Sequence, residues 1–243
     1  MLSERDVVVE FRDVWKKYSM EDVLHRSLRE DIMRIFCRDG KQLKKGEFWA
    51  LRGISFKLFK GECVALYGPN GAGKSTILKL IASVTDPTSG SVNVAGKVAP
   101  LIEIGAGFHP DLTGRENILV NGIIIGFRLK EIKNKIQDII AFSELGPFID
   151  VPVKKYSSGM YLKLAISIAV HSNASILLID EILGVADQEF RKKCLLALRN
   201  LIKEGKTVIM VSHDMNILEE ISHRILYIEK GEITLEKCIR RLD

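Results

Sequence analysis

A glycine-rich segment at residues 68–76 has the residue types and the spacing needed to hold phosphate groups. It reads GPNGAGKST, which matches the pattern G-x-x-x-x-G-K-[ST]. The apolar segment 63–67 (CVALY) precedes it, and a helical pattern at 74–83 follows. Glycines let successive backbone N–H groups turn inward around an anion at the start of a helix. The segment therefore predicts a phosphate-binding loop for a nucleotide.

The side chains of this loop suggest separate roles. Lys74 would reach the β- and γ-phosphates, the Ser75 hydroxyl would coordinate Mg²⁺, and Thr76 would add a hydroxyl near the α-phosphate. The nucleotide-binding residues expected in this segment are Gly68, Pro69, Asn70, Gly71, Ala72, Gly73, Lys74, Ser75 and Thr76.

Polar side chains at the ends of two other apolar segments complete the predicted site. Segment 176–180 ends at Asp180, with Glu181 directly after it, and His213 follows segment 207–211. In enzymes with such a loop an aspartate holds Mg²⁺, and a glutamate beside it can act as the general base for water. We expect His213 to sense the γ-phosphate, because ligands bind at the carboxyl ends of parallel strands. The alternatives are that Asp180 only caps the next segment and that His213 is a structural histidine.

Alternating strands and helices must position these residues. Apolar and β-branched runs predict strands at 7–13, 49–59, 63–67, within 91–104, and at 176–180, 207–211 and 224–229. Apolar side chains at helical spacing predict helices at 21–37, 74–83, 113–125, 130–141, 159–171, 188–203 and 214–221. Near-continuous apolar strands that alternate with helices favour an α/β domain with a buried parallel sheet. We expect one domain with a helical insertion.

The composition excludes several classes of protein. The 243 residues include 36 Lys+Arg and 31 Asp+Glu, giving a formal charge of +5, which is ordinary for a globular chain. The 4 cysteines are far apart and form no C-x-x-C pair, which excludes a disulfide framework and a zinc knuckle. We expect no secretory signal peptide and no span of the ~18–20 apolar residues that cross a bilayer. Because no basic and aromatic platform is recognisable, we also predict no nucleic-acid partner.

A further motif, Tyr156-Ser157-Ser158-Gly159-Met160, lies between the phosphate loop and Asp180, at the start of a helical pattern. It resembles the signature loop of the ATP-binding cassette (ABC) ATPases, usually written LSGGQ, with Ser157 and Gly159 retained. Asp187 lies where that family has its D-loop aspartate. The order phosphate loop, signature, Asp-Glu, D-loop and His is specific to the family. The resemblance covers residues 7–230.

This resemblance implies a fold. The fold class would be α/β, with a P-loop NTPase core of the ABC ATPase type, an antiparallel β subdomain and a helical signature subdomain. A single ABC ATPase domain would span residues 1–243. It would carry a helical and basic insertion at 21–46, and a Q-loop-like segment with the helical subdomain at 103–171.

The resemblance also implies an ATPase with ATP and Mg²⁺ as cofactors. Glu181 and His213 would be catalytic, and Ser75 and Asp180 would hold the metal.

In the family two chains sandwich two ATP molecules head to tail, so a second copy of this chain would be a partner. Ser157, Ser158 and Gly159, at the positive end of a helix, would bind the γ-phosphate held by the other copy's loop. Tyr18 resembles the aromatic residue that stacks on adenine, with Trp15 as its rival.

Three departures from the commonest ABC pattern narrow the resemblance. The signature reads YSSGMYLKLAISIA, and the insertion at 21–46 is extra. Residues 102–117 contain no Gln, so Glu103 and His109 compete for the role of the Q-loop glutamine. Together with the phrase GAGFHPDLTGREN, these features resemble the ABC ATPases that export O-antigen, capsule and teichoic acid.

The narrower resemblance implies that a transmembrane permease subunit docks on residues 103–117 and that lipid-linked polysaccharide is handled indirectly. The chain would lie peripherally on the cytoplasmic face of the inner membrane. The helix at 21–37 would lie near that membrane, where its basic residues could meet anionic headgroups. Its alternative is a solvated surface helix. The alternative functions are an ABC transporter ATPase for another substrate, or a soluble ABC protein acting on nucleic acid or ribosomes.

Overall fold

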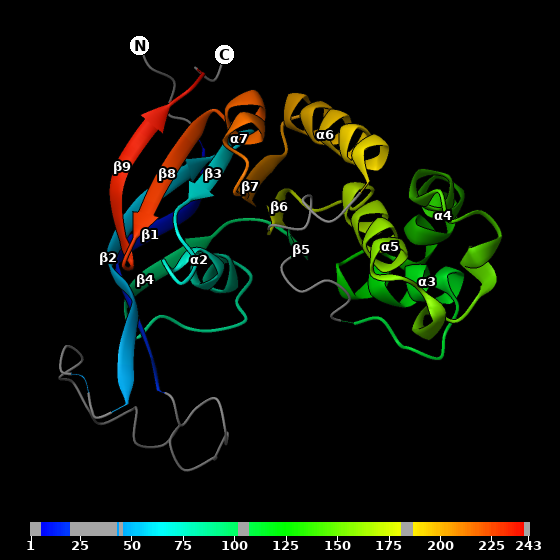
Figure 1. Ribbon diagram of the computed structural model, residues 1–243, viewed down its shortest axis with the longest axis horizontal. Helices are drawn as coiled ribbons and strands as arrows, with labels where there is room; N and C mark the ends of the chain where they lie inside the picture. The colour runs from blue at the N-terminus through cyan, green and yellow to red at the C-terminus, as the bar shows by residue number, and fades with distance from the viewer. Residues whose placement is uncertain (1–5, 20–42, 44–45, 102–106, 181–186, 241–243) are drawn as a thin grey trace.

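Two sheets and a group of helices make up the described part of the chain (Figure 1). The computed structural model describes residues 6–19, 43, 46–101, 107–180 and 187–240. The predicted helix at 21–37 lies outside these residues, as do Glu103 and Glu181.

The central sheet has six strands in the order β5-β6-β7-β3-β8-β9. They are β3 (Cys63–Tyr67), β5 (Val98–Leu101), β6 (Ile176–Ile179), β7 (Thr207–Val211), β8 (Arg224–Glu229) and β9 (Glu232–Cys238). All neighbouring pairs are parallel except β8 and β9, which are antiparallel. The predicted parallel sheet is therefore confirmed. Because parallel strands end at the same edge, the residues that follow β3, β6 and β7 lie together there.

A second, antiparallel sheet has the order β2-β1-β4. Its strands are β1 (Val7–Ser19), β2 (Glu47–Phe59) and β4 (Ser89–Val94). β1 continues past residue 13, where the sequence predicts its end. The prediction stops early because a β-bulge interrupts the alternation of the strand at that point. The register shifts between Phe11 and Val14, and Asp13 has a φ of 44°. After the bulge the alternation resumes, with Val14 and Lys16 buried.

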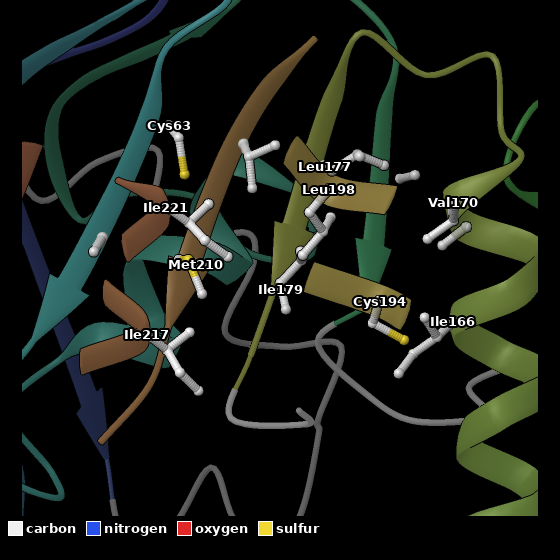
Figure 2. Packing of buried hydrophobic residues seen from close by; sticks show 14 of the residues in the cluster. Cys63, Ile166, Val170, Leu177, Ile179, Cys194, Leu198, Met210, Ile217 and Ile221 are labelled. Carbon is white, nitrogen blue, oxygen red and sulfur yellow. The ribbon is translucent and has the colours of Figure 1, made fainter. Parts of the chain in front are cut away.

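The central sheet is covered on both faces. One face packs against α5 (Ser158–Val170), α6 (Gln188–Lys203) and α7 (Met215–Ile221), and the other against α2 (Lys74–Ile81) and the antiparallel sheet. In β3, Cys63 and Ala65 belong to the first cluster and Val64 and Leu66 to the second. Figure 2 labels part of the first cluster: Cys63, Ile166, Val170, Leu177, Ile179, Cys194, Leu198, Met210, Ile217 and Ile221. Burial on both faces explains why these strands are continuously apolar.

The predicted helical subdomain is also confirmed. It contains α3 (Gly114–Ile124), α4 (Leu129–Ser143), α5 and two short 3-10 helices, Gly146–Asp150 and Val153–Lys155. Its core includes Ile118, Ile132, Ile139, Leu164 and Ile168. Thr113 and Glu116 form a capping box that starts α3. Among the described residues, no helix has both the length and the apolar character to cross a membrane.

Candidate functional site

The predicted phosphate loop joins β3 to α2 and is enclosed by backbone from neighbouring strands. A Cβ at Gly68 would overlap the carbonyl oxygen of Ile228. At Gly73, where φ is 111°, a Cβ would lie 2.6 Å from the carbonyl oxygen of Ala50. Ordinary contact distances are ~3.5 Å, so both positions accept only glycine. The enclosure therefore holds the loop in one conformation.

A tight turn between β8 and β9 is hydrogen-bonded to the phosphate loop. The N–H of Gly231 donates to the carbonyl oxygen of Ala72 at 3.0 Å. The carbonyl oxygen of the same Gly231 accepts a hydrogen bond from the N–H of Arg52 in β2 at 2.8 Å. The loop is thus tied to both sheets, and the N-terminus of α2 has a fixed place. Because the first N–H groups of a helix have no partner within the helix itself, an N-terminus with a fixed place is suited to binding phosphate.

Lys74 begins α2 and is buried, with 5% of its surface exposed. Its Nζ donates to the carbonyl oxygens of Gly68 at 2.7 Å and Pro69 at 3.0 Å. The ammonium group therefore lies against the first two residues of the loop. A phosphate cradled by this loop would meet that positive charge.

Ser75 and Asp180 come together although they are far apart in the sequence. The Ser75 hydroxyl donates to Oδ2 of Asp180 at 3.4 Å, at the carboxyl edge of the central sheet. Two neighbouring ligands of an octahedral Mg²⁺ lie about 3 Å apart, since each Mg–O distance is about 2.1 Å. A hydroxyl and a carboxylate oxygen at this spacing fit such an ion. In the described part of the chain no cluster of three or more His, Cys, Asp or Glu side chains is placed to hold a metal.

His213 lies at the same edge of the sheet. It follows β7, which stands between the strand that leads into the phosphate loop and the strand that ends at Asp180. Its side chain is exposed. The sheet order therefore places His213 between the two halves of the predicted site.

The signature residues lie elsewhere on the molecule. Ser157 caps α5, and its hydroxyl accepts a hydrogen bond from the N–H of Met160 at 3.2 Å. Ser157 and Ser158 are exposed, and Gly159 is half-buried. In Figure 1, α5 belongs to the helical group beyond β5 and β6, away from α2. Within the described residues the signature is thus separated from the phosphate loop of its own chain.

Tyr18 lies near the end of β1 and pairs with Phe48 of β2, their ring centres 6.1 Å apart. The Nζ of Lys16 lies 5.0 Å from the centre of the Tyr18 ring. Two residues beyond Phe48, Ala50 touches the phosphate loop at Gly73. Tyr18 is thus carried by the strand pair that borders the loop.

Trp15, the rival aromatic residue, is engaged within the antiparallel sheet. Its Nε1 donates to Oδ1 of Asp13 at 2.9 Å, and its ring meets Trp49 edge to face at 5.4 Å.

Of the two candidates for the Q-loop role, the structure describes only His109. Its Nδ1 accepts a hydrogen bond from the backbone N–H of Asp111 at 3.3 Å, and the backbone N–H of His109 donates to Oδ1 of the buried Asn117 at 2.7 Å.

Asp187, the predicted D-loop aspartate, caps α6. Its Oδ1 accepts a hydrogen bond from the N–H of Phe190 at 2.9 Å, and its Oδ2 pairs with Nζ of Lys163 on α5 at 2.8 Å. The hydrogen bond from Lys163 holds the pKa of Asp187 below its usual range. One turn later, Nη2 of Arg191 pairs with Oδ2 of Asp214, next to His213, at 2.6 Å. No pattern in the sequence marks Lys163, Arg191 or Asp214, because their partners lie on other elements.

A protein-family model described as "ABC transporter" matches residues 51–184. Among curated proteins, the chain is 45% identical over 227 residues to the O-antigen export system ATP-binding protein RfbB of Klebsiella pneumoniae, covering 93% of this chain and 92% of that protein. It is 48% identical over 236 residues to RfbB of Myxococcus xanthus, covering 96% of this chain and 54% of that protein. It is 43% identical to the teichoic acids export ATP-binding protein TagH of Enterococcus faecalis, covering 95% of this chain. This chain spans 50% of that protein, so it matches about half of the two longer relatives.

Solved structures share the fold. A dimeric ATP-binding cassette in a post-hydrolysis state, bound to ADP and Pi, superposes with a TM-score of 0.77 at 24% identity, covering 96% of this chain and all 100% of that chain. A dimeric bacterial ABC transporter cassette superposes with a TM-score of 0.76 at 25% identity, with the same coverage of 96% and 100%.

Proposed function

The chain belongs to the ABC transporter family and is an ABC-type ATPase, and on this premise we propose that it powers export of a lipid-linked polysaccharide through a separate transmembrane subunit. The predicted family and fold class are confirmed. One observation carries the proposed substrate class. Relatives named as subunits of O-antigen and teichoic acid export systems are 43% to 48% identical over nearly all of this chain.

The proposed chemistry is hydrolysis of the γ-phosphate of ATP. The loop N–H groups and Lys74 would hold the phosphates, and Ser75 and Asp180 would hold Mg²⁺, which neutralises phosphate charge when it is bound. The hydrogen bond between Ser75 and Asp180 supports this pairing. Glu181 follows Asp180 directly and would take a proton from the attacking water, while His213 would contact the γ-phosphate.

The proposed site is completed by a second copy of the chain. The positive N-terminus of α5, with Ser157, Ser158 and Gly159, would bind the γ-phosphate held by the partner's loop. Two observations support this arrangement. Both serines are exposed, and α5 is separated from the phosphate loop of its own chain (Figure 1).

Adenine would stack on Tyr18 at the end of β1. The proximity of β2 to the phosphate loop at Gly73 supports this choice, as does the engagement of Trp15 with Asp13 and Trp49.

The permease would dock on the helical subdomain. Along α3, Val120, Ile123 and Ile124 are exposed, with 39%, 51% and 62% of their surface accessible. A Cβ at Gly107 would lie 3.2 Å from Cδ1 of Ile124, so this apolar stripe borders the segment predicted to contact the permease. A membrane partner would then hold the chain at the cytoplasmic face of the inner membrane. We propose neither transport of another substrate nor action on nucleic acid, because the relatives described above are named for export of polysaccharides.

Deletion of the gene tests the proposal in the cells that make the protein. Polysaccharide should disappear from the cell surface and its lipid-linked form should accumulate inside. The wild-type chain and Lys192→Ala, at an exposed position on α6, should restore export, whereas Lys74→Ala should not. Surface polysaccharide that is unchanged by the deletion would contradict polysaccharide export.

A further inference from the structure

The loop that carries His213 is tied to the first turn of α6. Asp214 follows His213 and caps α7: its Oδ1 accepts a hydrogen bond from the N–H of Asn216 at 3.1 Å. Its backbone N–H donates to the hydroxyl of Ser212 at 3.1 Å. The remaining carboxylate oxygen, Oδ2, pairs with Nη2 of Arg191 at 2.6 Å. Both neighbours of His213 are therefore held by hydrogen bonds, and Arg191 adds a contact from another helix.

The first turn of α6 is itself anchored on its other side. Asp187 caps the helix and pairs with Lys163 of the signature helix α5 at 2.8 Å. Lys163 also lies over the ring of Phe190, 5.0 Å from its centre, and Phe190 is fully buried. Arg191, the next residue, thus projects from a turn that is held by a helix cap, an ion pair and a buried ring.

We propose that Arg191 is a positioning residue for His213. Its ion pair with Asp214 holds the loop between β7 and α7 at the place where His213 can meet the γ-phosphate. The inference rests on the proposed role of His213 in hydrolysis. Arg191 itself contacts neither phosphate nor water in this scheme, and it acts only through the loop.

The exposure of the pair makes this inference testable. The Arg191 and Asp214 side chains are 29% and 39% exposed. Ion pairs in such surroundings contribute little to folding stability, so removing one should leave the fold intact. A loss of ATP hydrolysis would then reflect a shift of the loop that carries His213.

The chain provides a matched control on the same two helices. Arg199 of α6 pairs with Glu220 of α7, and their side chains are 41% and 47% exposed. This pair also joins α6 to α7, but it lies farther along both helices from His213. Removing it should change the α6–α7 contact without moving the His213 loop.

The experiment measures ATP hydrolysis, ATP affinity and thermal unfolding of Arg191→Gln, Asp214→Asn, Arg199→Gln and His213→Ala. Asparagine is also a good helix cap, so Asp214→Asn removes the charge and keeps the cap of α7. We expect Arg191→Gln and Asp214→Asn to lower kcat about tenfold, because small misplacements of a reacting group are costly. ATP affinity should stay within twofold of wild type, and Arg199→Gln should retain wild-type kcat.

The double variant Arg191→Gln/His213→Ala tests whether Arg191 acts by positioning His213 or by a structural effect that is independent of His213. If Arg191 acts through His213, the double variant should be no slower than His213→Ala alone. Losses that multiply, or an equal loss in Arg199→Gln, would overturn the inference while leaving the proposed function intact. If His213→Ala hydrolyses ATP at the wild-type rate, the proposed role of His213 fails first, and the inference fails with it.

Discussion

Replacing Gly73 by alanine tests whether enclosure by backbone shapes the phosphate loop. The added Cβ would lie 2.6 Å from the carbonyl oxygen of Ala50 and 2.7 Å from Cδ2 of Leu51. Restoring ordinary contact at ~3.5 Å requires the loop and β2 to separate by almost 1 Å. The φ of 111° adds strain of about 1–3 kcal/mol for a residue with a side chain.

These quantities predict a large functional effect with a moderate loss of stability. Misplacement by about 1 Å can slow a reaction about 100-fold, so kcat/KM for ATP should fall by that factor. Strain of this size should lower Tm by about 3–10 °C in a chain of this length. Phosphate release measures the first quantity, calorimetric titration with ATP measures the affinity, and scanning calorimetry measures Tm.

Gly71 supplies the matched control. Its φ is 77°, but among the described residues no atom outside Gly71 and its two chain neighbours lies within 4 Å of a Cβ placed there. Gly71→Ala therefore adds backbone strain of about 1–2 kcal/mol without a clash, and we expect less than a tenfold loss of kcat/KM. Equal losses in the two variants, or wild-type hydrolysis by Gly73→Ala, would refute the steric reasoning.

Three further predictions concern other parts of the chain. Glu181→Gln should abolish hydrolysis and leave ATP affinity unchanged, as measured by phosphate release and calorimetry; near-normal turnover would remove Glu181 as the general base. Tyr18→Ala should raise the Kd for ATP about tenfold by loss of stacking, whereas Trp15→Ala should not, and the reverse order would make Trp15 the adenine residue. Burial raises the pKa of the Cys63 thiol to about 12, so the reactive thiolate is scarce at pH 8. Iodoacetamide should therefore label the exposed Cys238 and leave Cys63 unlabelled until the chain unfolds, as measured by peptide mass spectrometry.

Local sequence determines much of this architecture. β3 and the glycines after it predict the phosphate loop because strand, loop and helix are contiguous. The strands β6, β7 and β8 are predicted closely because burial on both faces makes them continuously apolar. The sequence does not predict β9, since Glu232–Cys238 is an edge strand that is mostly exposed and lacks an apolar pattern.

Long-range pairing explains what the sequence could not predict. The bulge at Asp13 hides the second half of β1, because the alternation that marks a strand changes face there. The pairs Lys163–Asp187 and Arg191–Asp214 each join different elements, so no spacing along the chain reveals them. Ser75 and Asp180 were predicted as ligands of one metal, yet their proximity follows only from the sheet order.

We propose that ATP joins two copies of this chain, with the phosphate loop of one copy facing the signature of the other. Light scattering during size-exclusion chromatography tests it with the Glu181→Gln variant, which should bind ATP without consuming it. Without nucleotide we expect the mass of one 27.3 kDa chain, and with MgATP twice that mass. Adding Ser157→Asp keeps a good helix cap on α5 but places a negative charge against the γ-phosphate, so this double variant should remain a monomer. A mass of 27.3 kDa for Glu181→Gln at saturating MgATP, or a dimer that Ser157→Asp does not weaken, would contradict the account.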